Sequence, residues 1–73
     1  MPGLPVISGA DAVRVFERAG WRIDRQRGSH VVMLKEGSIS SLSIPQHKEL
    51  APGTLRALIR YAGMTVEEFR SLM

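Results

Sequence analysis

The stretch WRIDRQRGSHVVML, residues 21–34, decides the fold because it contains two strand patterns joined by a tight turn. Trp21 and Ile23 alternate with charged residues, which is the period-two pattern of a half-buried strand. The Gly-Ser pair at 28–29 is typical of a turn, and a compact run rich in β-branched residues, 30–34, follows it. The stretch therefore predicts an antiparallel β-hairpin.

A second turn and a third strand pattern follow the hairpin. Residues 36–37 are a Glu-Gly pair, which is typical of a turn. In the segment 39–44, Leu42 and Ile44 alternate with serines, and Pro45 then ends the strand. We therefore expect three consecutive antiparallel strands connected by tight turns.

Helix patterns lie on both sides of this sheet. Ser8 has the position of an N-cap before an apolar stripe at helical spacing in residues 12–19. Pro52 suits the first turn of a second helix, whose apolar stripe covers residues 55–62. The Thr-x-x-Glu pattern at 65–68 predicts a capping box for a short last helix. The element order is α-β-β-β-α with a small helical appendage.

The chain of 73 residues is long enough for one domain, which we expect to span residues 1–73 as an α+β layer of helices on one sheet face. The chain has no cysteine, which fits a reducing cytoplasm and leaves no thiolate for metal binding. It has no apolar run of membrane-spanning length and no secretory signal pattern. We therefore expect a cytoplasmic protein that does not span a membrane.

The charge favours an anionic partner. Ten basic residues against seven acidic ones give a net charge of +3, and nucleic acid is the commonest partner of such a chain. Four of the basic residues lie between positions 22 and 35, where only Asp24 opposes the arginines. Two histidines and the scattered carboxylates do not have the spacing of a zinc site, so we expect no metal or cofactor.

His30 is the candidate catalytic residue. Histidine accepts and donates protons near neutral pH, and RNA carries its own nucleophile in the ribose 2′-hydroxyl. RNA cleavage then needs a proton acceptor, a proton donor and charge stabilisation, which a histidine among arginines supplies. Arg25 and Arg27 precede the turn, so we expect them across the hairpin from His30 and Val32. An ordinary surface role for the histidine is the alternative that spacing alone leaves open.

Other polar residues have weaker signals. His47 lies in the loop after the third strand, where it either caps the following helix or supports a ligand, and Lys48 beside it is a candidate phosphate contact. Arg56 and Arg60 lie four residues apart on the second long helix, an unfavourable pair that bound phosphate would relieve. A solvated helix face is the alternative. Trp21 is interpreted as a core anchor.

Five stretches of the chain form an ordered set of motifs: LPVISG at 4–9, RGSH at 27–30, IPQHKEL at 44–50, PGTLR at 52–56 and AGMTVEEF at 62–69. With these motifs in this order, the chain resembles the HicA (YcfA-like) toxin family over nearly its whole length. The resemblance implies a double-stranded-RNA-binding-domain-like fold, mRNA interferase activity and a HicB antitoxin that occludes the active site. It also implies that the histidine of the Gly-Ser-His motif, here His30, is catalytic. Residues 35–41 depart from the family pattern, because many relatives carry several basic residues there.

The leading hypothesis is a metal-independent endoribonuclease, the toxin of a type II toxin–antitoxin pair, which is monomeric when free and hetero-oligomeric with its antitoxin. His30 acts as general acid or base, and Arg25 and Arg27 hold the scissile phosphate. Gly28 lets the backbone approach the RNA closely, and neighbouring amides such as that of Ser29 add hydrogen bonds. The further candidate RNA contacts are Lys48, Arg56 and Arg60. The alternatives are a non-catalytic RNA-binding module and an interaction protein for an acidic, antitoxin-like partner.

Overall fold

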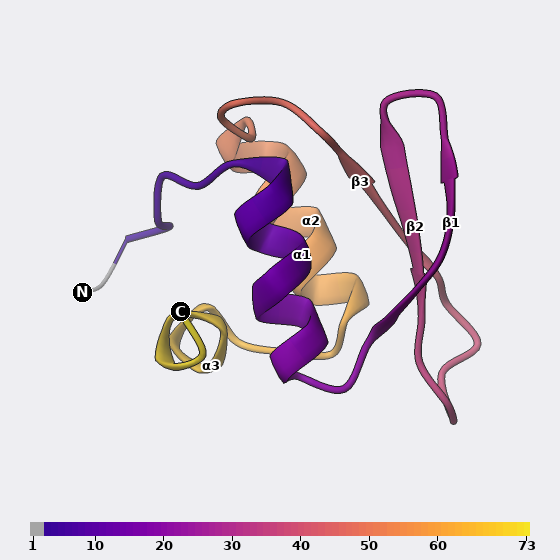
Figure 1. Ribbon diagram of the computed structural model, residues 1–73. Helices are drawn as coiled ribbons and strands as arrows, with labels where there is room; N and C mark the ends of the chain where they lie inside the picture. The colour runs from indigo at the N-terminus through magenta and orange to yellow at the C-terminus, as the bar shows by residue number, and fades with distance from the viewer. Residues whose placement is uncertain (1–2) are drawn as a thin grey trace.

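The computed structural model describes residues 3–73, which form three helices and a three-stranded antiparallel sheet (Figure 1). The expected α-β-β-β-α order with a short C-terminal helix is confirmed. The elements are α1 (Gly9–Arg18), β1 (Arg22–Arg27), β2 (His30–Leu34), β3 (Leu42–Pro45), α2 (Pro52–Tyr61) and α3 (Val66–Ser71). None of the helices described here is long and apolar enough to cross a membrane.

Two of the helices begin at the caps that the sequence predicts. The Asp11 amide donates a hydrogen bond of 3.0 Å to the Ser8 hydroxyl at the start of α1. At the start of α3 the Thr65 amide donates to the Glu68 carboxylate at 2.8 Å, and the Glu68 amide donates to the Thr65 hydroxyl at 3.0 Å. These bonds satisfy amides that have no partner inside the helix, and each such cap contributes about 1 kcal/mol to stability.

The hydrophobic core lies between the helices and one face of the sheet, which we call the inner face. α1 and α2 cover this face, and α3 closes the layer at one end (Figure 1). Phe16 of α1 and Phe69 of α3 are fully buried, with ring centroids 5.2 Å apart. Trp21 is only 3% exposed, which confirms it as a core anchor. The sheet contributes four buried side chains to this core: Val31, Met33, Leu42 and Ile44.

The turn between β1 and β2 fixes the register of the hairpin. Arg27 pairs directly with His30, so Gly28 and Ser29 are the only residues in the loop. Gly28 has a φ of +58°, the left-handed conformation that the first central residue of a type II′ turn requires. From this turn backwards, Gln26 pairs with Val31, and the next pair along the strand is Arg25 with Val32.

One extra residue in β1 changes which side chains share a face. Arg25 pairs with Val32 and Ile23 pairs with Met33, so Asp24 is an unpaired residue in a β-bulge. Ile23 therefore lies on the inner face with Met33, whereas Arg25 lies on the opposite, outer face. In a regular strand residues 23 and 25 would share a face, because side chains alternate with a period of two. The bulge thus reverses the alternation between the start and the end of β1.

The third strand is shorter than expected. The sequence predicted a strand over residues 39–44, but β3 begins only at Leu42, opposite Met33. Ile39 is fully exposed in the connecting loop. Within that loop the Ser38 hydroxyl accepts a hydrogen bond from the Ser40 amide at 3.3 Å and donates to the Ser40 carbonyl at 3.2 Å. These local bonds compete with strand pairing, which explains the late start of β3.

Backbone hydrogen bonds join the start of α1 to the segment after β3. The Gly9 amide donates to the His47 carbonyl at 2.9 Å, and the Leu50 amide donates to the Ile7 carbonyl at 2.9 Å. The contact is so close that a Cβ atom at Gly9 would lie 2.0 Å from the Pro45 carbonyl oxygen. Only glycine fits between the helix and this segment.

We expect Gly9→Ala to lower the free energy of unfolding by about 1–3 kcal/mol or more, because the added methyl group forces α1 away from the Pro45 backbone. Gly53→Ala is the matched control: Gly53 is helical, its Cβ would meet nothing within 4 Å, and alanine favours helix by up to about 1 kcal/mol. Urea denaturation followed by circular dichroism measures both. Equal stability of Gly9→Ala and the wild type would contradict this packing.

Candidate functional site

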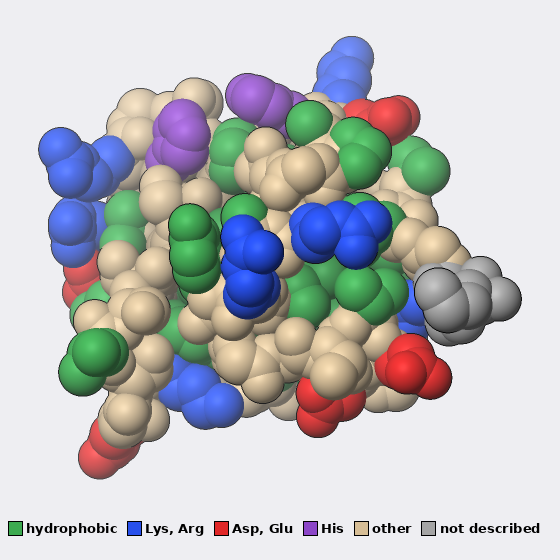
Figure 2. Space-filling view, turned by 180° about the vertical axis from the view of Figure 1, so that it is seen from behind, with side chains coloured by type: hydrophobic (Ala, Val, Ile, Leu, Met, Phe, Trp, Pro, Cys, Tyr) green, Lys and Arg blue, Asp and Glu red, His purple; other side chains and the backbone are tan. Residues whose placement is uncertain are grey.

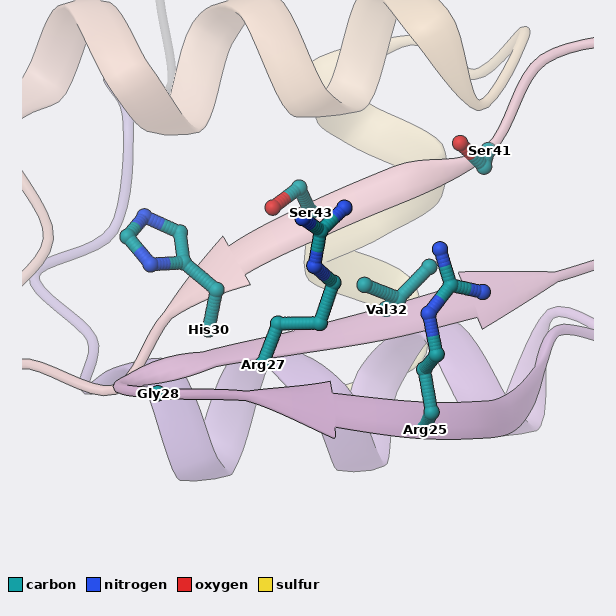
Figure 3. A pocket seen from close by; sticks show the side chains of 7 residues that line it. All are labelled: Arg25, Arg27, Gly28, His30, Val32, Ser41 and Ser43. Carbon is teal, nitrogen blue, oxygen red and sulfur yellow. The ribbon is translucent and has the colours of Figure 1, made fainter.

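The outer face of the sheet is not covered by any of the three helices and carries a shallow cavity. The cavity has a volume of about 610 Å³. Figure 3 shows its lining side chains on one side of the sheet, with contributions from all three strands or their ends. The lining residues are Arg25, Arg27, Gly28, His30, Val32, Ser41 and Ser43.

Strand register brings the predicted catalytic histidine and the two predicted arginines together. Arg27 lies directly opposite His30, and Arg25 lies directly opposite Val32. Side chains directly opposite each other in an antiparallel pair have Cβ atoms about 4.5–5.5 Å apart. In Figure 3 both guanidinium groups project from β1 across β2 towards β3. The expectation that both arginines lie across the hairpin from His30 and Val32 is confirmed.

The two arginines differ in their electrostatic surroundings. Arg25 forms an ion pair with the Asp24 carboxylate, the unpaired residue of the bulge. Arg27 forms no ion pair with any residue between positions 3 and 73. The charge beside His30 is therefore uncompensated, whereas the charge at the other end of the cavity is partly neutralised by its neighbour.

The sequence did not predict that Ser41 and Ser43 line the site, and it placed Val32 opposite the arginines without assigning it a role there. Val32 is 7% exposed and forms an apolar floor between the two arginines (Figure 3). Ser43 lies opposite Val32 on β3, and Ser41 lies two residues before it. A signal for the serines was present, because Leu42 and Ile44 face the core and their alternating neighbours must face outward.

The turn next to the cavity is held by the backbone. The Ser29 carbonyl accepts a hydrogen bond of 2.7 Å from the Gln46 amide, which ties the β1–β2 turn to the end of β3. Gly28 lines the cavity, and a Cβ atom there would meet nothing within 4 Å. Of the two turn residues, Gly28 contributes open space to the site, whereas Ser29 lies outside the cavity lining.

The remaining candidate residues lie outside the cavity. Arg56 and Arg60 are exposed on α2, which packs against the inner face, so the sheet separates them from His30. Lys48 and His47 are exposed in the loop after β3, and neither lines the cavity. Figure 2 agrees with this dispersed arrangement: Lys and Arg side chains form several separate groups, and the histidine side chains lie along the upper edge.

No metal-binding cluster occurs in the part of the chain that the structure describes. Groups of three or more His, Cys, Asp or Glu side chains that could together hold a metal ion are absent from residues 3–73. The groups that line the cavity and could take part in chemistry are its histidine, arginines, serines and backbone.

Comparisons with known proteins point to one family. The profile of the family described as HicA toxin of bacterial toxin-antitoxin matches residues 9–64. A solved structure described as a toxin–antitoxin complex from Streptococcus pneumoniae is similar to this fold, with a TM-score of 0.71 and 30% sequence identity. The similarity covers 80% of this chain and 98% of that chain. No curated protein matches the chain.

The positions of the arginines lead to a prediction for nucleic-acid binding. If a single-stranded oligonucleotide binds in the cavity, we expect it to contact Arg25 and Arg27. The Arg25→Ala, Arg27→Ala double variant should then flatten the slope of log affinity against log salt by roughly 1.4 units, about 0.7 for each contact. The Arg56→Ala, Arg60→Ala variant removes the same charge from α2 and should leave the slope unchanged. Fluorescence anisotropy at several salt concentrations measures the slopes. The reverse pattern would place the nucleic acid on the helices.

Proposed function

The chain belongs to the family of HicA toxins of bacterial toxin–antitoxin systems, and on that premise we propose that it is an mRNA-cleaving toxin with His30 as its catalytic residue. The observation that carries the proposal is the direct pairing of His30 with Arg27 on an uncovered sheet face. A proton-transfer group and an uncompensated positive charge are thus adjacent in an open cavity, as cleavage of a phosphodiester requires.

The proposed reaction is an internal transesterification of RNA. The neutral imidazole of His30 accepts the proton of a ribose 2′-hydroxyl, and the 2′-oxygen forms a bond to the adjacent phosphorus. The bond between phosphorus and the 5′-oxygen breaks, and the leaving 5′-oxygen takes the proton back from the imidazolium. The products are a 2′,3′-cyclic phosphate and a 5′-hydroxyl, and His30 returns to its neutral form. The step consumes no water, metal ion or cofactor.

Arg27 supplies the charge stabilisation in this reaction. Negative charge accumulates on the phosphoryl oxygens in the transition state, and a guanidinium can donate two parallel hydrogen bonds to them. Loss of one such preorganised donor typically lowers the rate by about 10²–10³-fold. Gly28 leaves room beside this position, because it lines the cavity without a side chain.

The proposed partner is a HicB-like antitoxin, a protein that covers the outer face. An open, polar cavity with exposed arginines offers little enclosure to a small molecule, whereas a protein can cover it broadly and present carboxylates. A relative of similar fold is described as a toxin–antitoxin complex, which supports this partner. Because the substrate is mRNA, the toxin acts in the cytoplasm.

The histidine proposal is tested with two matched variants. We expect His30→Ala to lose RNA cleavage and growth arrest on overexpression, because no other group takes over the proton transfer. His47→Ala should retain both, because that exposed side chain lies outside the cavity and only its backbone carbonyl bonds to Gly9. Circular dichroism checks that both variants fold. Full toxicity of folded His30→Ala would disprove the assignment.

The chemistry has its own substrate controls. A substrate with a single 2′-deoxyribose at the cleaved position should resist the wild-type protein, because the nucleophile is missing. Cleavage of unmodified RNA should persist in excess EDTA, since the proposed step uses only side chains. Cleavage of the 2′-deoxy substrate, or loss of activity on chelation with recovery by a divalent ion, would overturn the mechanism.

Antitoxin and RNA should compete for the outer face. In a titration of the cognate antitoxin into a fluorescent complex of RNA with His30→Ala protein, we expect the RNA to be released. The antitoxin complex should also melt at a higher temperature than the free toxin, because the partner binds only the folded state. A stable ternary complex with unchanged RNA affinity would show that the antitoxin acts elsewhere.

A further inference from the structure

We infer that the outer face of β1 is a track for single-stranded RNA, on which Arg27, Arg25 and Arg22 contact three successive phosphates in that order. The inference rests on the proposed function, and it assigns distinct roles to arginines that otherwise form one basic patch. Arg27 contacts the phosphate that is cleaved, next to His30. Arg25 and Arg22 contact the two phosphates that follow on one side of it.

The bulge places all three arginines on the outer face. Arg27 pairs with His30, Arg25 with Val32 and Arg22 with Leu34. The three partner residues alternate along β2, which is regular, so they share the outer face and are spaced by about 6.7 Å. Without the extra residue Asp24, position 22 would face the side opposite to position 25. The bulge therefore places all three arginines opposite evenly spaced residues of β2.

The directions of the side chains fit separate phosphates better than one shared phosphate. In Figure 3 the guanidinium groups of Arg27 and Arg25 run roughly side by side across β2 and do not converge. The apolar floor formed by Val32 lies between them. An apolar floor between two cationic positions suits the ribose or base that joins two phosphates. At its far end the cavity is lined by Ser41, whose hydroxyl can donate to the second phosphate.

The charges separate catalysis from binding along the track. Arg27 has no ion-pair partner among the residues described, so its full charge acts where negative charge develops. Arg25 forms an ion pair with Asp24, which partly neutralises its charge. Arg25 therefore contributes to holding the RNA and much less to the chemical step. Arg22 is exposed beyond the cavity, so it contributes only when the RNA extends that far.

A substrate-length series tests the track. A bond that the protein cleaves is first located in a long RNA. The substrates are oligonucleotides that contain this bond and are shortened by one nucleotide at a time on each side. The effects should depend on length on one side of the cleaved bond only. On that side, removal of the phosphate assigned to Arg25 should abolish the effect of Arg25→Ala on kcat/KM, and removal of the phosphate assigned to Arg22 should abolish the effect of Arg22→Ala. Each effect should be roughly tenfold on full-length substrates and fall mainly on KM. Arg27→Ala should lower kcat by about 10²-fold at every length.

Arg14→Ala is the control, because Arg14 is an exposed arginine on α1 whose ion pair to Asp11 lies outside the cavity. Arg→Lys variants at positions 22 and 25 keep the charge and should recover most of the lost binding. Equal losses for Arg22→Ala and Arg25→Ala at every substrate length, or on both sides of the cleaved bond, would overturn the track.

Failure of the track can be told apart from failure of the proposed function. If the wild-type protein cleaves no RNA, the proposed function fails, and the affinities of 2′-deoxy oligonucleotides of one sequence and decreasing length are measured instead. The track then still requires that the effects of Arg25→Ala and Arg22→Ala disappear at different lengths. If the protein cleaves RNA but the two effects do not depend on length, only the track fails.

Discussion

The site depends on one extra residue in β1. The start and the end of this strand need side chains on opposite faces of the sheet at positions that a regular strand would place on one face. The two-residue turn pairs Arg27 with His30, which directs Arg27 and Arg25 to the outer face. The core requires Trp21 on the inner side, and Ile23 lies there opposite Met33. All four are odd-numbered positions, so a regular strand would place them on one face. The bulge at Asp24 satisfies both requirements, and the same residue forms an ion pair with Arg25.

The histidine end of the cavity is positioned by backbone contacts. The Gln46 amide donates to the Ser29 carbonyl in the turn that precedes His30, and the carbonyl of the following residue, His47, accepts from the Gly9 amide. This arrangement connects the start of α1, the end of β3 and the β1–β2 turn. Backbone atoms have little conformational freedom in such an arrangement. The backbone of His30 at the start of β2 is therefore held in place, although its side chain faces solvent.

Much of the fold was predictable because its signals are local. The caps at Ser8 and Thr65 and the turn before His30 each depend on a few adjacent residues, and all three were predicted correctly. The start of β3 was predicted wrongly at Ile39, because alternation alone does not reveal that the serine-rich loop bonds to itself. Family resemblance, in addition to spacing, singled out the histidine.

The arrangement of the site was only partly predictable because it depends on which face each residue occupies. The apolar run Val31, Val32 and Met33 gives no alternation from which to decide the outward side of β2. Neither the bulge nor the role of Val32 as the cavity floor follows from sequence spacing. Arg56 and Arg60 have a basic pattern as suggestive as that of the strand arginines, yet their helix packs on the other side of the sheet. Charge patterns along a chain do not show which residues share a surface.

We propose that RNA binds to the bare face of the sheet and not to the helical layer. The most direct measurement is a titration of ¹⁵N-labelled protein with a 2′-deoxy oligonucleotide that cannot be cleaved, followed by amide chemical shifts. We expect the largest changes in β1, in the turn before His30 and around Ser41 and Ser43, with α2 nearly unchanged. Large changes along α2 with an unperturbed β1 would contradict it.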